Sequence, residues 1–320
     1  RETTAAEDFM QQVMVAMGGS TGPPMIGKRR SHDLAFIHIP SNFGHSIAKA
    51  ALATPQSMAF SGWVDASFKD PDQERSRMYI QAARGPGGEL WAAMLPELRA
   101  ESELTGCELY KTPQKYWPDE LAARYFTYDG VQNRTVTGVL RDPYDKLVNE
   151  FRLQLEGSGS KYEPASRTDV SQREGSLERE SDQYKEYYTT CDVNSWLKEE
   201  LMKVKAGDKF RADCHFVPQA EYFDGPNGIN MPIDNRRIPL SINEVMEHHG
   251  YIVEMSREET VYQNLQCDVS AWSLDDEVKR LVKEIYARDF ALICKHFGYC
   301  DRDELTCMSH IPGMCGGSPY

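Results

Sequence analysis

The residues best suited to chemistry in this chain lie in two short stretches, each where a predicted strand gives way to a predicted helix. The first is the loop Ser41–Ser46, which contains Gly44 and is followed by the helix-forming run Ile47–Leu52. A strand, a tight loop with a glycine and a helix together aim free backbone amides and the positive end of a helix dipole at an anion. The loop therefore predicts a site for a phosphate-bearing ligand, and the alternative is an ordinary strand-to-helix turn.

The second stretch places an arginine at the same kind of position. Thr135–Leu140 is rich in residues that favour strands, Arg141 follows it directly, Asp142 can cap the next helix, and Pro143 suits the first helical turn. Ligands of open α/β sheets bind at the carboxyl ends of the strands. Arg141 is therefore predicted at the edge of the sheet where ligands bind.

The apolar pattern predicts the elements that position both stretches. Leu34–Ile39 is an apolar run typical of a strand buried on both faces, and Pro40 ends it because proline has no amide hydrogen for a ladder. After the second stretch, Leu147, Phe151 and Leu155 recur at four-residue spacing and predict one buried helix face. Strands that alternate with helices in this way predict an α/β fold.

Further helices are expected downstream. Asn194–Val204 and Ser241–His249 both read as helices. A long helix is expected to start at Ser273, which can cap it, to carry acidic residues in its first turn, and to run toward Gly298.

The chain divides into three unequal parts. We expect an N-terminal helix and linker in residues 1–33, a main domain in residues 34–299, and a cysteine-rich tail in residues 300–320. Within the main domain, residues 157–184 are rich in Gly, Ser, Glu and Arg and predict a polar insertion.

The charge of the chain narrows the class of partner. Its 320 residues have a formal net charge of −13, which argues against a nucleic-acid partner, because proteins that bind nucleic acid usually carry a basic face. No apolar run approaches the roughly 20 residues needed to cross a bilayer. Because the first residue is Arg1 rather than Met, we expect that an upstream segment was removed, whether a signal, an anchor or a stretch cut off at an artificial boundary, and a membrane partner is expected only through that segment.

Eight cysteines indicate a disulfide framework rather than a metal site. None stands in a Cys-x-x-Cys pair, so no zinc or other metal is expected, and the connectivity stays open. Disulfides point to the secretory pathway, such as the Golgi lumen, or to the outside of the cell. The triplet Asn133-Arg134-Thr135 is a glycosylation sequon compatible with that location.

The two stretches also carry ordered motifs. The loop is preceded by His38-Ile39-Pro40 and contains Gly44 and Ser46, with Ile47 next. The second stretch reads Arg141-Asp142-Pro143-Tyr144-Asp145-Lys146, followed by Asn149 and Phe151. Together they resemble the sulfotransferases that use 3′-phosphoadenosine 5′-phosphosulfate (PAPS), particularly the carbohydrate type. In that family the loop has the form His-Ile-Pro-Lys-Thr-Gly-Gly-Thr-Ser, and the second motif is Arg-Asp-Pro, then Arg or Lys, then Ser and an aromatic residue.

Other segments extend the resemblance to an algal and marine branch of the family, so that it covers roughly residues 34–299. They are Asn194–Leu197, Cys214–Gln219, Tyr286–Phe290 and Phe297–Tyr299.

The resemblance implies a P-loop-like, three-layer fold with a central, mainly parallel sheet. It also implies a sulfotransferase that moves the sulfuryl group of PAPS to a hydroxyl or amine of a carbohydrate or small molecule. Such a cofactor has phosphates at both ends of its adenosine, so it requires two anion sites on one sheet edge. The loop is expected to bind the 5′-phosphosulfate and the second motif the 3′-phosphate. The implied cofactor-binding residues are Ser41, Asn42, Phe43, Gly44, His45, Ser46, Arg141 and Asn149.

The chain departs from the family pattern where the chemistry lies. Ser41 replaces the loop lysine, and Lys111 stands where the related branch has a histidine that is plausibly the base. Losing one charge-assisted contact removes about 1.5–3 kcal/mol, which is about ten- to a hundredfold in rate. Candidate catalytic substitutes are His45, Lys49 and Lys111, the last as a cation or, if burial lowers its pKa, as a base. His215 is either a structural hydrogen-bonding residue beside a disulfide or a functional one.

Two hypotheses therefore remain open. In the first, the chain is an active sulfotransferase with rearranged catalytic residues. In the second, it is a catalytically degenerate protein of the same fold that serves as a binding or structural subunit for a protein partner.

Overall fold

The computed structural model of the chain describes residues 34–44, 46–47, 96–128, 132–155, 182–249, 255 and 267–302. The predicted N-terminal helix and linker, most of the polar insertion, and the tail beyond residue 302 lie outside the described residues. His45 and Lys49 lie outside them as well.

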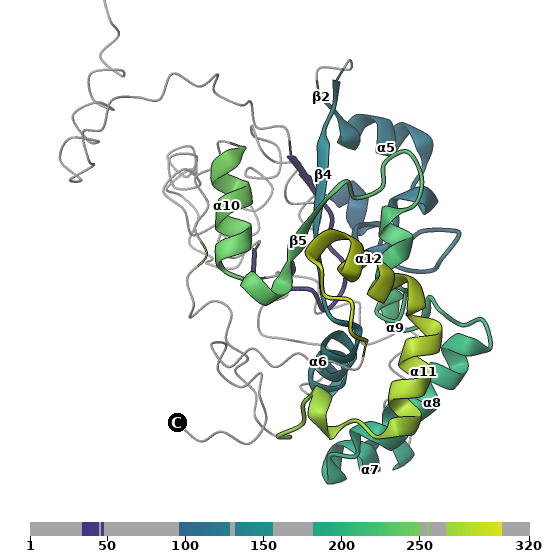
Figure 1. The fold of residues 1–320 in the computed structure, drawn as a ribbon. Helices are drawn as coiled ribbons and strands as arrows, with labels where there is room; N and C mark the ends of the chain where they lie inside the picture. Colours follow the sequence, from purple (N-terminus) through teal and green to yellow (C-terminus); the bar gives the residue numbers. More distant parts are fainter. Residues whose placement is uncertain are drawn as a thin grey trace, which may run out of the picture. The chain divides into compact units, whose positions relative to one another are not determined.

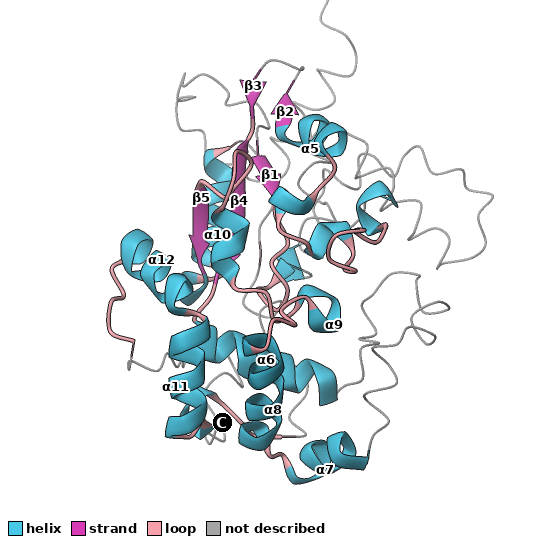
Figure 2. Cartoon of the chain, turned by 90° about the vertical axis from the view of Figure 1, so that its right-hand side faces the viewer, coloured by secondary structure: helices cyan, strands magenta, loops and turns pink. Residues whose placement is uncertain are grey.

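Three parallel strands form the central sheet of the described part of the chain. They are β1 (Leu34–Phe36), β4 (Thr135–Leu140) and β5 (Met231–Asp234), in the order β1-β4-β5, and Figures 1 and 2 show them side by side. The predicted strand Leu34–Ile39 is shorter than expected, although the Ile37 amide still donates to the Thr137 carbonyl at 2.7 Å. The α/β class is therefore confirmed.

Gly138 lets the middle strand pack closely against its surroundings. A Cβ atom at this position would lie 2.7 Å from Cδ1 of Ile229 and 3.1 Å from the carbonyl oxygen of Ile37. A side chain at this position would force the Ile229 side chain to shift and would crowd the Ile37 carbonyl, which favours glycine here although glycine weakens a strand interior.

Helices connect and cover the strands. Before β4 come α5 (Asp119–Phe126) and the short antiparallel pair β2 (Thr127–Tyr128) and β3 (Gln132–Asn133). The helices that follow β4 are α6 (Pro143–Leu155), α7 (Asp182–Thr190), α8 (Val193–Lys205), α9 (Arg211–Cys214), α10 (Leu240–His248), α11 (Asp276–Ile285) and α12 (Ala287–Phe297).

Three helix predictions can be compared with this arrangement. The predicted helices Asn194–Val204 and Ser241–His249 correspond to α8 and α10. The single long helix predicted from Ser273 is wrong, because α11 and α12 are separated at Tyr286, and Asp275 rather than Ser273 caps α11 by accepting a hydrogen bond from the Val278 amide at 2.8 Å. The last residues of the predicted insertion, 182–184, belong to α7.

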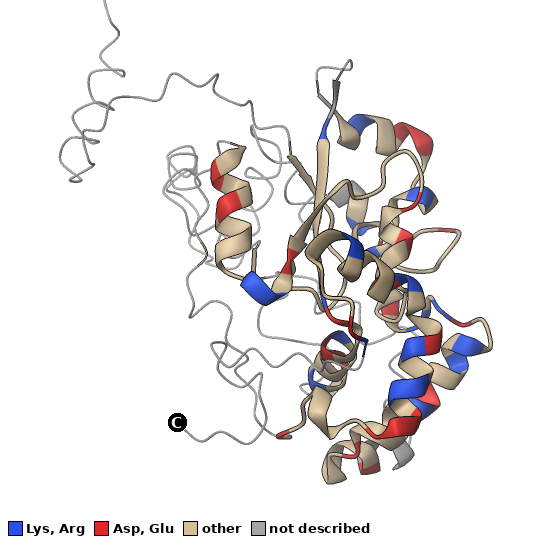
Figure 3. Ribbon diagram, in the orientation of Figure 1, with Lys and Arg blue, Asp and Glu red and all other residues tan. Residues whose placement is uncertain are grey.

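The buried apolar side chains form two clusters. One joins α6, α8 and α11 through residues such as Phe151, Trp196 and Leu281, and the other joins β1, β4 and α5 through residues such as Ile37 and Val136. On the predicted face of α6, Leu147 and Phe151 are fully buried, and each such side chain contributes about 1.5–3 kcal/mol. Arg141 lies where the chain passes from the second cluster to the first. Charged residues gather instead on helices such as α8 and α11, as Figure 3 shows.

Disulfides cross-link the described part of the chain. Cys107 is bonded to Cys214, Cys191 to Cys267, and Cys294 to Cys300. These bonds fit an extracellular or lumenal protein. None of the helices in the described ranges has the length and apolar character needed to span a bilayer.

Candidate functional site

The loop that follows β1 is buried and held in an uncommon backbone conformation. Ser41 and Phe43 have φ angles of 65° and 63°, which L-residues adopt rarely and at a cost of about 1–3 kcal/mol each. Asn42 anchors the loop, since its Nδ2 donates to the Val139 carbonyl at 2.7 Å and to Oε1 of Gln219 at 2.6 Å. These bonds tie the loop to the end of β4.

Gly44 allows a close approach of the loop to the strand that precedes it. A Cβ atom at Gly44 would lie 2.0 Å from Nδ1 of His38, whose ring packs edge-on against Tyr110 with ring centroids 5.3 Å apart. The glycine in the predicted phosphate loop therefore has a packing role in this structure, because the His38 ring occupies the space that a larger side chain needs.

Arg141 lies against this loop at the carboxyl end of β4. Its side chain is fully buried, its Nη1 donates to the carbonyl oxygen of Ser41 at 2.6 Å, and its Nε donates to Oδ2 of Asp145 at 2.6 Å. The guanidinium carbon is also 4.9 Å from the centre of the Phe43 ring. Asn149 approaches the same Ser41 carbonyl, at 3.5 Å from its Nδ2. The two predicted anion-binding stretches thus meet at one sheet edge.

Gln219 fastens the two stretches to the downstream segment Cys214–Gln219. Its Oε1 accepts from the Arg141 amide at 2.9 Å as well as from Asn42, and its Nε2 donates to the Arg141 carbonyl at 2.7 Å. Asp289 on α12 accepts from the amides of Gln219 and Ala220 at 2.9 and 2.8 Å. Burial raises the pKa of Asp289 to about 6, although these amide bonds oppose the shift.

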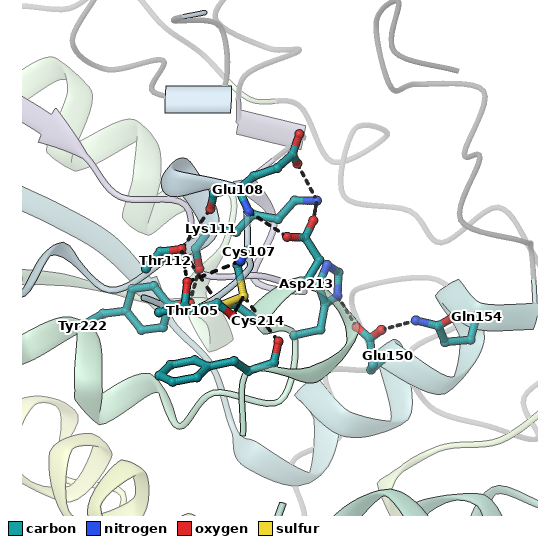
Figure 4. A network of polar contacts seen from close by, with 12 residues as sticks. Thr105, Cys107, Glu108, Lys111, Thr112, Glu150, Gln154, Asp213, Cys214 and Tyr222 are labelled. Carbon is teal, nitrogen blue, oxygen red and sulfur yellow. Dashed lines mark hydrogen bonds and ion pairs between the residues drawn. A yellow bond between two sulfur atoms is a disulfide. The ribbon is translucent and has the colours of Figure 1, made fainter. Parts of the chain in front are cut away.

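Glu150 of α6 is a buried carboxylate directly beside the loop. Its Oε2 accepts from the Ser41 hydroxyl at 2.6 Å and lies 2.6 Å from Nδ1 of His215, while its Oε1 accepts from Gln154 at 2.7 Å. Figure 4 shows Glu150 and Gln154 on the same helix. Burial alone would raise the pKa of Glu150, but the charge and hydrogen bond of His215, with the bonds from Ser41 and Gln154, lower it to about 2.

The order of Ser41, Glu150 and His215 differs from that of a serine-hydrolase triad. In serine hydrolases the histidine lies between the serine and the carboxylate and takes the serine proton. Here the carboxylate of Glu150 lies between Ser41 and His215, and the Ser41 hydroxyl donates to it. Among the described residues, the Ser41 hydroxyl is therefore bound to the carboxylate and not to the histidine.

Lys111 lies in a second polar network, shown in Figure 4. Its Nζ is 2.6 Å from Oδ2 of Asp213 and 3.0 Å from Oε2 of Glu108, and its side chain is only 8% exposed. Burial would lower the pKa of Lys111, but the charges of Tyr110, Asp213 and Glu108 outweigh burial and raise it well above its ordinary value. Lys111 therefore stays protonated, and the lowered pKa that a role as base requires is not found.

Most of α9 is a left-handed turn rather than a regular helix, and this turn connects the network of Lys111 to that of Glu150. Ala212, Asp213 and Cys214 follow one another with φ angles of 48°, 55° and 66°, each of which costs roughly 1–2 kcal/mol for a residue with a side chain. The Cys107–Cys214 disulfide and a 2.8 Å bond from the Glu108 amide to Asp213 hold the turn. His215 comes directly after it, with a side chain that is 21% exposed.

Lys146 supplies a further buried cation next to this turn. Its Nζ donates to the backbone carbonyl of His215. Burial lowers the pKa of Lys146 to about 8, against the opposing charges of Glu150 and Asp289.

The remaining predicted site residues fall into two groups. Ser46, the last residue of the loop, is half-buried, whereas His45 and Lys49 lie outside the described residues. The described ranges hold no group of three or more His, Cys, Asp or Glu side chains arranged for a metal ion. A separate open cavity of about 760 Å³ lies where α7 meets α8, lined by Glu186, Tyr187, Thr190, Asp192 and Ser195. Its carboxylates do not suit an anionic cofactor.

Comparison of the chain with protein-family models, with curated proteins and with solved structures finds no match.

Proposed function

We propose that the chain is a sulfotransferase that transfers the sulfuryl group of PAPS to a hydroxyl or amine of a carbohydrate or small molecule. The observation that carries the proposal is the 2.6 Å bond from Nη1 of Arg141 to the Ser41 carbonyl, because it joins the two family-like motifs at the ends of neighbouring parallel strands. Ligands of α/β sheets bind at that edge. The proposal includes the P-loop-like three-layer fold and a place in the Golgi lumen or outside the cell.

Within this proposal each stretch binds one end of the cofactor. The loop Ser41–Ser46 receives the 5′-phosphosulfate, and Arg141 with Asn149 receives the 3′-phosphate. Arg141 and the loop residues Ser41, Asn42 and Phe43 are buried, so the loop must open when the nucleotide enters. In the open state the phosphate competes with Asp145 for the guanidinium, whose planar fork suits phosphate and carboxylate equally.

A specific observation favours a second candidate, a degenerate protein that acts as a binding or structural subunit. Ser41 replaces a lysine, and its hydroxyl is bound to the ionised carboxylate of Glu150. Asp145 adds a second carboxylate within 2.6 Å of Arg141. Both carboxylates repel an anionic cofactor at close range. They also bind the Ser41 hydroxyl and the Arg141 guanidinium, so these two groups have partners without a ligand.

Calorimetry of the full chain with 3′-phosphoadenosine 5′-phosphate (PAP) tests the proposal. We expect measurable binding that weakens by about ten- to a hundredfold in Arg141→Lys, which keeps the charge but loses the planar fork. Arg237→Ala is the matched control, because Arg237 is an exposed arginine paired with Glu244 on α10, and it should bind PAP as the wild type does.

Two results would count against sulfuryl transfer. Absence of PAP binding at millimolar concentration contradicts the proposal outright. Binding in the wild type without transfer, with transfer gained in Ser41→Lys, supports the degenerate protein instead.

A further inference from the structure

The pair formed by His215 and Glu150 has no part in the nucleotide contacts proposed above. Glu150 is completely buried, whereas the imidazole of His215 is 21% exposed, so the ring is the end of the pair that a substrate can reach. The Ser41 hydroxyl and Nδ1 of His215 both lie 2.6 Å from the same oxygen, Oε2 of Glu150. The imidazole is therefore separated from the proposed phosphosulfate loop by a single carboxylate oxygen.

The carboxylate fixes the state of the imidazole. A carboxylate can only accept hydrogen bonds, and Oε2 of Glu150 lies 2.6 Å from Nδ1 of His215, so Nδ1 carries the hydrogen of this pair. In the neutral ring the other nitrogen, Nε2, then has a free electron pair. A buried carboxylate that orients an imidazole in this way is the arrangement that makes histidine an effective general base.

We propose that His215 is the general base of the transfer reaction and that Glu150 is its positioning residue; the inference rests on the proposed function. Nε2 of His215 takes the proton of the acceptor hydroxyl. The acceptor oxygen then forms a bond to the sulfur of PAPS as the bond from sulfur to the bridging phosphate oxygen breaks. The electron pair of that bond leaves with PAP, and the proton on Nε2 later passes to solvent.

The other charged groups near the imidazole, Asp213 and Lys146, form their hydrogen bonds with groups other than the ring. Asp213 faces His215 from the left-handed turn, but Lys111 and the Glu108 amide already bind its two carboxylate oxygens. Lys146 donates to the backbone carbonyl of His215 rather than to the ring. The backbone at His215 is therefore held by the turn that precedes it and by the bond from Lys146 to its carbonyl, and this fixes the position of the ring beside Glu150.

The test measures the release of PAP from PAPS, with lactose as the hydroxyl acceptor and water as the background acceptor, in parallel with PAP calorimetry. His215→Ala should bind PAP within about threefold of the wild type but turn over about 10²- to 10⁴-fold more slowly. Imidazole at tens of millimolar should raise the turnover of His215→Ala by at least about tenfold and leave that of the wild type unchanged. Loss of a merely structural ring gives no such rescue. His248→Ala, which removes an exposed histidine on α10, is the control and should turn over like the wild type.

Two further variants separate a base from a packing residue. His215→Asn can still donate to Glu150 but has no nitrogen that accepts a proton, so its rate should fall as in His215→Ala. Glu150→Gln should lower kcat by about tenfold or more and leave KM for PAPS unchanged, because Glu150 acts through the imidazole.

The outcomes distinguish the inference from the function on which it rests. A rate in His215→Ala or His215→Asn within about threefold of the wild type overturns the base role, as does a loss that imidazole does not rescue. PAP binding without turnover in the wild type also overturns the base role and leaves nucleotide binding standing. Absence of PAP binding in the wild type overturns the proposed function itself.

Discussion

Glu150→Gln offers a test of the site that needs no ligand. The carboxylate has a pKa of about 2 in the folded chain, against an ordinary value of 4.5. A difference of that size corresponds to about 3 kcal/mol in favour of the folded state at pH 7. Because the folded-state pKa is the lower one, the contribution is complete above about pH 5 and is lost as the pH falls toward 2.

The measurement is the free energy of unfolding in urea, at several pH values between 7 and 3, for the wild type and Glu150→Gln. Gln mimics the protonated carboxyl, so the two proteins should differ by about 3 kcal/mol at pH 7 and progressively less below pH 5. Glu244→Gln is the control, since Glu244 is an exposed carboxylate paired with Arg237, and its effect should stay below about 1 kcal/mol.

A difference between wild type and Glu150→Gln that stays the same from pH 7 to pH 3 would refute the reasoning. Such a result would mean that the pKa of Glu150 is no lower in the folded chain than in the unfolded chain, so that its hydrogen bonds to Ser41 and His215 do not stabilise the carboxylate in solution. A difference that appears equally in Glu244→Gln would show that the net charge of the chain, rather than the buried pair, sets the pH dependence.

Two further predictions concern the scaffold of the site. The double variant Cys107→Ser with Cys214→Ser opens a covalent loop of 107 residues, so it should lower the free energy of unfolding in urea by about 4 kcal/mol relative to the wild type. An unchanged unfolding midpoint would contradict a role for this disulfide in holding the turn before His215. Gly44→Ala should lower the free energy of unfolding by about 1–3 kcal/mol, because its Cβ would overlap the His38 ring. In a His38→Ala background the same substitution should cost much less. Equal losses with and without His38 would contradict the contact.

Sequence patterns were sufficient to predict where the two stretches lie. The loop and the arginine each follow a predicted strand, so both are predicted to lie at the carboxyl edge of the sheet. The parallel order β1-β4-β5 brings Arg141 to the Ser41 loop as expected. The same patterns missed Glu150, although it stands three residues after Leu147 on the inward face of α6. A charge on a buried face is a signal that a partner exists, but the partner, His215, is 65 residues away in sequence and cannot be identified from spacing.

Tertiary contacts also explain the helix that was predicted as continuous. The apolar pattern runs through Tyr286 without interruption, yet the Tyr286 hydroxyl donates to the Phe216 carbonyl at 2.9 Å. Three residues on, Asp289 accepts from the amides of Gln219 and Ala220. These contacts bind the start of α12 to the segment Phe216–Ala220. Because they are tertiary contacts, the break between the two helices cannot be predicted from the local spacing of apolar residues.

The serine at position 41 determines how the two candidate functions differ. In this structure the ionised Glu150 has Ser41 and His215 as its neighbours, so a lysine introduced at position 41 would bring a second cation to the same carboxylate. If His215 is the base, that lysine competes with the imidazole for Glu150 and loosens its orientation, and turnover falls even though the loop gains a charge. If the chain is degenerate, the lysine supplies the cation that the leaving phosphate needs, and turnover rises from nothing. The sign of the change in Ser41→Lys therefore decides between the two functions, whereas PAP binding by itself is compatible with both.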